Sequence, residues 1–498
     1  MRAYVCVRTD NENAIITNAE FEMKKQTKTA LLTLSITMVL LLSIPSSVFI
    51  MDAATGEVYS KSYYAEWGKM YSKLRKNGNK KIVLIGNSAV AFGVNSKLIQ
   101  NELSIDGLDY EVVNFGLYGA LGTKFMLDFS INHLNKDDIA IIMPEEYPQS
   151  MSLYENKTEQ WKAFEGARDA YFEVPFQTKG TYINGYFEYV AGKGTLVGKE
   201  MVDGVYALSS FDDNCDMSYE RKDNQMLPYF HAVGNEIVFD DSLLNPSFLS
   251  YLNQYAKKAK AKGAATYYLL APMNERGIAK GESVSSFYQT LSEKLSFPIL
   301  GNPEDSVMEA NWFYNSDFHL NSAGMQEFSL RLLSAIKNEF AISSPSSTPH
   351  PEMPELPKTD DFIQGDDSDE AFFTYEEVEG GGYSVTSLLD EERESLVLPS
   401  THLGKPVVGF SASLFQNNKV VKEITIQENV RMILDYSFSG CSSLRKVILT
   451  NPKPSSLLVG FHLLDGAESL RFYVPKEAHS SYVLDYLWGR YAEYLETI

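Results

Sequence analysis

A serine, a histidine and an aspartate in this sequence have the spacing and context of an acyl-transfer site. Ser88 follows the apolar run KIVLIG, at the start of a helix-like segment. Asp317 and His319 lie two residues apart in NWFYNSDFHLNSAG, so in extended backbone their side chains would leave on the same side. A serine nucleophile needs a base, and the base needs a carboxylate to orient it. We therefore predict Ser88 as nucleophile, His319 as base and Asp317 as its partner.

Simpler interpretations of the same residues stay open. A serine at a strand-to-helix junction is commonly a helix N-cap. Asp317 could cap the helix predicted over 322–339 while His319 only packs. In VVNFGLYGALG, Gly116 and Gly119 could bring backbone N–H groups close to a substrate oxygen, or they could simply form a turn.

Alternating strands and helices are predicted to position these residues. Short apolar runs predict buried parallel strands at 82–85, 110–115, 139–143 and 265–271. Helix-like stretches between or beside them cover 63–76, 96–103, 122–134 and 251–262. This alternation predicts an α/β sheet, which carries reactive groups at the carboxyl ends of its strands. Residues 150–245, rich in Tyr, Phe and Gly, are predicted to be an insertion over the strand ends or a lid.

The N-terminal region is predicted to direct the chain to a membrane. Lysines precede an uncharged run at 29–51, which has about the ~20 residues that a membrane-spanning helix needs. It is predicted to be a transmembrane signal anchor, or a signal peptide cleaved near Ala53 and Ala54. By the positive-inside rule the rest of the chain lies outside the cytoplasm. The expected location is a cell membrane, single-pass with an extracellular C-terminal part, or secreted or on the cell surface after cleavage.

The residues that flank this run have their own predictions. Residues 1–28 would be a cytoplasmic N-terminus, and Met23 begins what looks like a complete export signal, which makes 1–22 an over-long gene start. Residues 52–80 would form a juxtamembrane helix.

Charge and cysteine content exclude several classes of protein. The formal net charge of −21 would repel a nucleic-acid backbone, and no local basic patch follows the N-terminal lysines. Cys6, Cys215 and Cys441 are far apart and odd in number, so they predict neither a disulfide framework nor a metal site. Single thiols, two of them buried, are expected.

The C-terminal third has a different composition. Residues 343–378 contain five prolines followed by an acidic cluster and are predicted to be a linker. Residues 379–498 contain short β-rich runs that repeat. Ile424 and Val447 match at a spacing of 23 residues, and Phe415 and Phe438 keep the same spacing.

The blocks around the predicted triad resemble those of SGNH/GDSL hydrolases over residues 81–342. GNS with Ser88, NFG with Gly116, and DFHLNSAG with Asp317 and His319 are similar to the first, second and fifth blocks of that family. The resemblance implies a flavodoxin-like three-layer α/β sandwich with a parallel sheet. It also implies a Ser-His-Asp triad and an oxyanion hole built from the Ser amide, the Gly116 amide and an Asn side chain.

Two residues depart from the family pattern. Asn87 stands where the family usually has an aspartate before the nucleophile. In MPEEY, Glu145 lies about where the family has its oxyanion-hole asparagine, and a carboxylate there would repel an oxyanion. Glu145 and Glu146 could instead bind a substrate cation or hydroxyl, or belong to a solvated loop.

Together with the predicted anchor, the second departure resembles SGNH-like proteins that modify cell-envelope polymers, such as alginate O-acetylation and teichoic-acid D-alanylation proteins. The resemblance implies an acyl-esterase or O-acyltransferase that acts on a cell-surface polysaccharide through an acyl-Ser88 intermediate. It implies a membrane-bound acyltransferase as partner and no metal or organic cofactor. The alternative is an inactive SGNH scaffold in a surface adhesion protein.

The C-terminal repeats resemble the BspA-like leucine-rich repeats of bacterial surface proteins. Residues 424–449 match that repeat, and FYVPKEAHSSYVLDYLWGRYAEYL is similar to its terminal unit. The resemblance implies a short β-solenoid closed by Trp488, with Cys441 as a packed core thiol and a protein or glycan as ligand.

Overall fold

The computed structural model describes residues 28–29, 32–33, 46–194, 196, 204–232, 236–358, 362–485 and 487–498. The chain forms two compact units, and the smaller comprises Met1–Val58 and Tyr186–Val197. The larger unit, Tyr59–Gly185 and Gly198–Ile498, has a mixed α/β fold with parallel sheets. The predicted α/β class is confirmed at this level.

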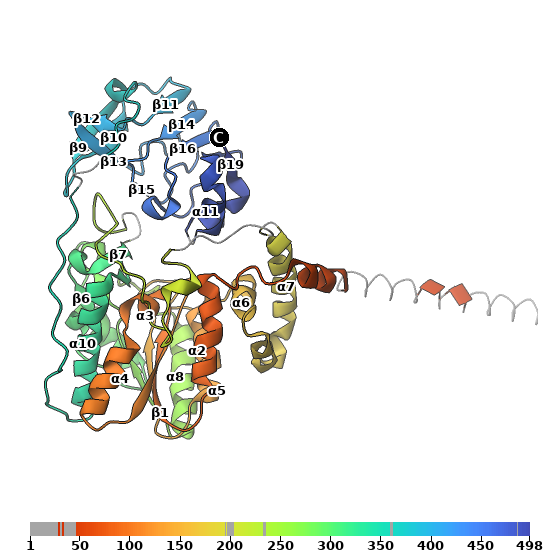
Figure 1. Cartoon of the computed structure of the whole chain (residues 1–498), viewed down its shortest axis with the longest axis vertical. Helices are drawn as coiled ribbons and strands as arrows, with labels where there is room; N and C mark the ends of the chain where they lie inside the picture. Colours follow the sequence, from red (N-terminus) through yellow and green to blue (C-terminus); the bar gives the residue numbers. More distant parts are fainter. Residues whose placement is uncertain are drawn as a thin grey trace, which may run out of the picture. The chain divides into compact units, whose positions relative to one another are not determined.

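A four-stranded parallel sheet lies at the centre of the α/β part (Figure 1). Its strand order is β2-β1-β3-β4, with β1 at Lys80–Gly86, β2 at Tyr110–Gly116, β3 at Ile139–Met143 and β4 at Ala265–Tyr268. The inner strand β1 is buried from residue 81 to residue 86. A strand covered on both faces favours a continuous apolar run, which explains why the sequence located these strands.

Helices cover both faces of this sheet. Their bounds are α2 Glu66–Leu74, α3 Ser88–Gly93, α4 Ser96–Ile105, α5 Thr123–His133, α8 Pro246–Ala261, α9 Val284–Lys294 and α10 Ser322–Glu339. The predicted helices are present, with ends shifted by a few residues. The N-cap of α10 is Asn321, whose side chain accepts from Gly324 N at 2.8 Å. Neither Asp317 nor Ser322 therefore caps this helix.

The segment predicted as an insertion, 150–245, contains α6 Lys157–Phe164, α7 Lys179–Gly194, η3 Arg168–Glu173, η4 Phe176–Thr178 and η5 Leu208–Ser210. Its α6 helix is joined to the main core through aromatic contacts. The ring of Trp67 on α2 lies 5.4 Å from that of Phe164 and 5.1 Å from that of Phe129. This part of the segment shares the hydrophobic core of the α/β fold.

Small strands and 3₁₀ turns follow the central sheet. They are β5 Met273–Asn274, η6 Glu275–Gly277, η7 Pro303–Ser306, β6 Val307–Met308, η8 Ala310–Trp312, β7 Phe313–Ser316 and β8 His319–Leu320. Strands β7 and β8 are antiparallel, and Ser316 pairs with His319. Asp317 and Phe318 therefore form the turn of a hairpin. The condition for a shared side of Asp317 and His319, extended backbone between them, is not met, because the chain reverses there.

The C-terminal region contains a second parallel sheet, in the order β11-β14-β16-β18-β19. These strands are Ser395–Val397, Glu423–Ile426, Lys446–Leu449, Arg471–Val474 and Leu495–Thr497. Ile424 pairs directly with Val447, and the rings of Phe415 and Phe438 stack at 6.2 Å. Residues that the sequence matched at a spacing of 23 are thus neighbours in space.

Other elements complete this region. They are η9 Glu370–Phe372, β9 Phe373–Glu377, β10 Tyr383–Leu388, β12 Thr401–His402, β13 Lys405–Phe410, β15 Met432–Ile433, η10 Pro454–Ser456, β17 Leu458–Val459, η11 Lys476–Ala478, α11 His479–Leu484 and η12 Trp488–Tyr494. Trp488 is fully buried, and its Nε1 donates to Leu457 O at 2.8 Å. Cys441 and Cys215 are buried, as predicted, whereas Cys6 lies outside the described residues.

The predicted linker is ordered against the α/β part. Ser347 and Thr348 donate hydrogen bonds to the buried carboxylate of Glu102 on α4, at 2.6 to 2.9 Å. Strand β9 already begins within the predicted range 343–378. Hydrogen bonds hold this polar part of the segment, and Leu356 packs against the buried Leu227 and Phe230.

In the smaller unit, residues 46–55 are helical. Asp52 accepts from Lys193 Nζ at 2.6 Å and from the Tyr186 hydroxyl at 2.8 Å. This buried ion pair and hydrogen bond join the helix to the end of α7 within the unit.

The predicted membrane localisation is contradicted. Within the described ranges, no helix is both long and apolar enough to cross a membrane. Most of the predicted span 29–51 lies outside the described residues, as does the predicted gene start.

Trp67→Ala tests the shared core. Trp67 is fully buried among Tyr71, Phe125, Phe129 and Phe164, so its removal should cost about 3–5 kcal/mol of unfolding free energy. Urea unfolding followed by circular dichroism measures this loss. The matched control, Phe172→Ala, removes a side chain that is 76% exposed and should change the free energy by less than about 0.5 kcal/mol. Equal losses in both variants would contradict this assignment.

Candidate active site

The pairing of β1 with β3 brings Ser88 to Glu145. Gly86 at the end of β1 pairs with Met143 at the end of β3, and Ser88 and Glu145 each follow two residues later. Ser88 Oγ donates to Glu145 Oε1 at 2.7 Å. The backbone N–H of Ala89 donates to the same oxygen at 3.0 Å. The predicted nucleophile therefore contacts a carboxyl group at the carboxyl end of the sheet.

Two glycines let α3 approach the strands closely. A Cβ on Gly86 would overlap the carbonyl of Met143, and a Cβ on Gly116 would overlap the side chain of Val90. Gly116 thus allows α3 to pack. Gly119 lies closer to the reactive groups, because a Cβ there would be 3.6 Å from Asn87 Nδ2 and 3.8 Å from Glu145 Oε2.

A buried polar network supports Glu145 from the loop side. Asn87 Nδ2 donates to Ser150 Oγ at 2.8 Å, and Thr123 Oγ1 donates to Asn87 Oδ1 at 2.7 Å. Ser150 Oγ is 3.4 Å from Glu145 Oε2. Asn87, expected near the oxyanion hole, is therefore fully engaged in orienting the loop that carries Glu145.

The adjacent carboxyls of Glu145 and Glu146 have different environments. Desolvation raises the pKa of Glu145, although hydrogen bonds from Ser88, Ala89 and Ser150 oppose this shift. Glu146 is 1% exposed, and burial raises its pKa well above the usual value. The Glu146 Oε2 atom has no hydrogen-bond partner in the described part of the chain. Burial therefore favours the neutral form of Glu146, whose side chain does not lie in a solvated loop.

His319 on β8 packs against Phe92, which lies one helical turn after Ser88 on α3. Its ring stacks on Phe92, four residues after Ser88, with centroids 4.0 Å apart and planes 9° from parallel. His319 Nδ1 is 2.8 Å from Asn315 Oδ1, and Asn315 Nδ2 donates to the Tyr206 hydroxyl at 2.8 Å. Because the Asn315 carbonyl oxygen faces the ring, Nδ1 carries the proton in this network.

Asp317 points elsewhere. Its carboxyl accepts from Ala232 N at 3.0 Å and from Asn274 Nδ2 at 2.8 Å, and it packs against Gly277. Burial raises the pKa of Asp317 to about 7. In this structure Asn315, rather than the predicted Asp317, is the hydrogen-bond partner of His319.

Arg221 is a fully buried cation near the histidine. Its Nε donates to Leu320 O at 3.0 Å, and its Cζ lies 5.3 Å from the centre of the Phe92 ring. No carboxylate pairs with it among the described residues. Burial and the Arg221 charge lower the pKa of His319 to about 3, so the imidazole is neutral near pH 7.

Sequence reasoning missed several of these residues. The contact of Asn315 with His319 could have been predicted from a two-residue turn at Asp317 and Phe318. Such a turn places His319 beside the strand that contains Asn315. Arg221 and Ser150 lie in polar stretches, and no local pattern discloses that they or Thr123 are buried. No cluster of three or more His, Cys, Asp or Glu side chains suited to a metal was found in the portion of the chain described.

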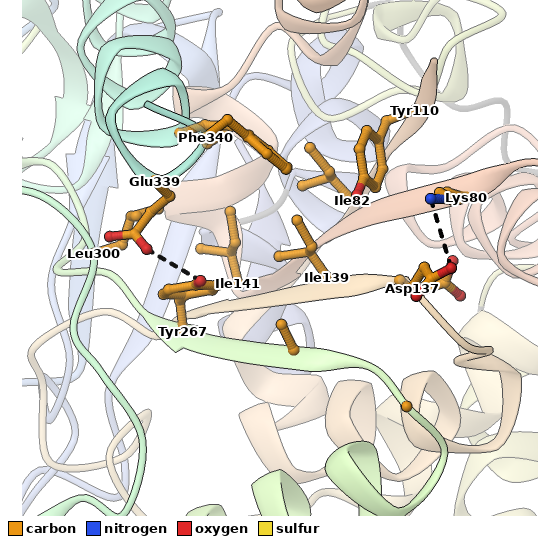
Figure 2. Close-up of a pocket in the computed structure, with 14 residues that line it drawn as sticks. Lys80, Ile82, Tyr110, Asp137, Ile139, Ile141, Tyr267, Leu300, Glu339 and Phe340 are labelled. Carbon is orange, nitrogen blue, oxygen red and sulfur yellow. Dashed lines mark hydrogen bonds and ion pairs between the residues drawn. The ribbon is translucent and has the colours of Figure 1, made fainter. Parts of the chain in front are cut away.

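A cavity of about 300 Å³ lies at the opposite, amino-terminal edge of the same sheet (Figure 2). Isoleucines of β1 and β3 line it, between Lys80, which is 3.5 Å from Asp137, and Tyr267, whose hydroxyl donates to Glu339 at 3.2 Å. The length of β1 separates this cavity from Ser88, so the cavity is not part of the candidate site.

Comparisons with known proteins give few matches to this chain. No protein-family model and no curated protein matches the chain. Among solved structures, it is similar to a leucine-rich cell surface protein from Faecalibacterium prausnitzii A2-165, with 21% sequence identity and a TM-score of 0.19. The match covers 20% of this chain and 28% of that chain, so only a short part of each is compared.

His319→Gln tests the buried neutral imidazole. The folded pKa of about 3 lies below the ordinary 6.5, so the unfolded state binds the extra proton between these values. Stability should therefore fall as the pH falls from 6.5 towards 3, by up to about 5 kcal/mol from this group. Urea midpoints of both proteins at several pH values measure the difference, which should shrink towards acid pH. A difference independent of pH would contradict the burial of a neutral ring.

Asp317→Asn should show the opposite dependence. The folded pKa of about 7 exceeds the ordinary 3.8, so the native state holds a proton that the unfolded state releases. The contribution of Asp317 is complete below pH 3.8 and is lost as the pH rises through 7, by up to about 4 kcal/mol. The wild-type free energy of unfolding, measured relative to the variant, should therefore decrease from pH 4 to pH 7.5. An increase over this range would show an ionised, triad-like carboxylate.

Proposed function

We propose that this chain is a serine-dependent acyl-esterase or O-acyltransferase that acts on a cell-surface polysaccharide, with Ser88 as nucleophile. One observation carries the proposal. Ser88 Oγ, at the carboxyl end of an inner strand of the parallel sheet, donates to a carboxyl oxygen at 2.7 Å beside the Ala89 amide. A hydroxyl that donates to an acceptor beside a backbone N–H has the surroundings required for acyl transfer.

The chemistry would proceed through an acyl-Ser88 ester. Ser88 Oγ attacks the carbonyl carbon of an acylated sugar, and the Ala89 N–H binds the carbonyl oxygen as negative charge develops. Water or an acceptor hydroxyl then releases the acyl group. The polysaccharide substrate and a partner acyltransferase come from the resemblance to SGNH-like envelope proteins.

The repeats are proposed to form a short leucine-rich-repeat solenoid that binds a protein or glycan. Support comes from the parallel pairing of β14, β16 and β18, and from the buried Ile424 and Val447, which occupy equivalent positions. Each unit covers its apolar side chains against the next, as in repeat proteins.

A second candidate function is an inactive SGNH scaffold in a surface-binding protein. The observation that favours it is Glu145 itself, which occupies the Ala89 N–H that an oxyanion would need. A scaffold of this kind would use its fold for binding and would not cleave esters.

Ser88→Ala tests the choice between them. The purified wild-type protein should bind a fluorophosphonate probe covalently at Ser88 and release acetate from acetylated glycans. The variant should lose both, because the attacking oxygen is absent; the expected loss of rate is about 10³-fold or more. A matched control, Ser130→Ala, removes a buried hydroxyl on α5 that bonds Leu127 O and Tyr255, and it should keep activity. A folded wild-type protein that neither reacts nor releases acetate would support the scaffold.

A further inference from the structure

Two side chains near Ser88 are candidates to accept its proton. A general base has to lie within about 2.6–3.2 Å of the proton donor. Glu145 Oε1 meets this requirement at 2.7 Å. The hydrogen bond of His319 joins Nδ1 to Asn315 Oδ1, and among the described residues no hydrogen bond joins the ring to Ser88.

We propose that Glu145, rather than His319, is the general base that activates Ser88. This inference rests on the proposed function and replaces the base that the sequence predicted. It also gives a role to Glu145 at the position where SGNH/GDSL hydrolases have an asparagine. A carboxyl there supplies a proton acceptor, whereas an asparagine would supply a hydrogen-bond donor to the oxyanion.

Base strength supports the same choice. A base works best when its pKa lies near the working pH. The pKa of His319 is held at about 3, which makes the imidazole a weak base. Desolvation moves the pKa of Glu145 upward from 4.5, towards neutrality. Glu145 thus contacts the hydroxyl directly, and its pKa shifts in the direction of a stronger base.

The groups facing Glu145 leave it free to ionise alone. From α3 it meets the Ser88 hydroxyl and the Ala89 amide, and from its own loop it meets the Ser150 hydroxyl. Its titratable neighbours among the described residues are Tyr63 on η1 and the adjacent Glu146, and burial raises the pKa of both, which favours their neutral forms. Two adjacent carboxyls with separated pKa values commonly take different roles. Here Glu146 keeps its proton and Glu145 exchanges one.

The proposed step balances. As Ser88 Oγ forms a bond to the acyl carbon, its proton passes to Glu145 Oε1, and the carbonyl electron pair moves onto the oxygen. Collapse expels the sugar alkoxide, which takes the proton from Glu145. In the second half, Glu145 takes a proton from water or an acceptor hydroxyl. It then returns this proton to Ser88 Oγ as the acyl group leaves.

Substrate binding would strengthen this base. In the resting site the Ala89 N–H donates to Glu145 and lowers its pKa. When a substrate carbonyl oxygen takes that N–H, the carboxylate loses a stabilising hydrogen bond. Its affinity for the Ser88 proton then rises as the acyl carbon arrives. One backbone amide can therefore serve the carboxylate at rest and the oxyanion during reaction.

The test compares Glu145→Gln with His319→Gln in hydrolysis of p-nitrophenyl acetate and in fluorophosphonate labelling. Glutamine keeps the shape and the acceptor oxygen of glutamate but cannot take a proton at neutral pH. Glu145→Gln should lower kcat/KM by about 10²- to 10⁴-fold, and His319→Gln by less than about tenfold. Glu339→Gln, at the far edge of the sheet, is the matched control. It should leave kcat/KM within about twofold of the wild-type value.

The pH profile adds a second readout. Wild-type kcat/KM should rise with pH to a plateau as Glu145 ionises, and Glu145→Gln should lack this limb. If Glu145→Gln is unstable, Glu145→Ala with added formate replaces it, since a small carboxylate in the vacated space should restore rate in proportion to its concentration.

Three results would overturn the assignment. The first is an active Glu145→Gln beside a His319→Gln that has lost 10²-fold or more, which would make the histidine the base. The second is a wild-type rate that falls as Glu145 ionises, which would make the protonated carboxyl an oxyanion donor. The third is a failure of the wild-type protein to label at Ser88, which alone would also refute the proposed function.

Discussion

The register between β1 and β3 is the constraint on which the candidate site depends. Because Gly86 pairs with Met143, the residues two positions beyond each strand end face one another, and these are Ser88 and Glu145. A shift of one residue would turn Glu145 to the other side of the chain. The absence of a side chain at Gly86 permits this register, because any Cβ would overlap the neighbouring backbone. The site is thus a consequence of how closely two strands and one helix approach.

Desolvation is the second physical theme of this region. Glu146, Asp317, His319 and Arg221 are all removed from water, and each changes its protonation tendency accordingly. The acids become harder to ionise and the bases harder to protonate, which is the expected direction for burial in a low dielectric. Arg221 differs from the other groups, because its lowered pKa of about 10 still leaves it charged near pH 7. Burial, and after it the Arg221 charge, lowers the pKa of the nearby His319 imidazole to about 3.

The sequence predicted what depends on local pattern. Strands such as 82–85 and 139–143 were located because burial on both faces requires continuous apolar residues. The equivalence of Ile424 and Val447 was visible because repeated units keep one spacing. The position of Ser88 at a strand end followed from the same patterns. The contact of Ser88 with Glu145 did not follow, since it depends on β3 lying beside β1.

The predicted partnership of Asp317 with His319 failed for a related reason. A spacing of two predicts a shared face only in extended backbone, and a two-residue turn reverses the direction in which the side chains leave. The turn sends Asp317 to Ala232 and Asn274 and leaves His319 with Asn315. The membrane prediction rested on the length of an uncharged run and its flanking lysines, and no helix among the described residues is both long and apolar enough to cross a membrane.

A carboxyl and an amide at the same position cannot perform the same chemistry. An asparagine at the position of Glu145 would donate to an oxyanion. Glu145 instead accepts hydrogen bonds from the Ser88 hydroxyl and the Ala89 amide. The acceptor role removes one donor from the oxyanion site and adds a base to the nucleophile. The Ala89 amide would then donate to Glu145 in the resting site and to the oxyanion during the reaction. Such a site stabilises the oxyanion less but activates the hydroxyl directly, so proton transfer and carbonyl binding become one coupled event at Glu145.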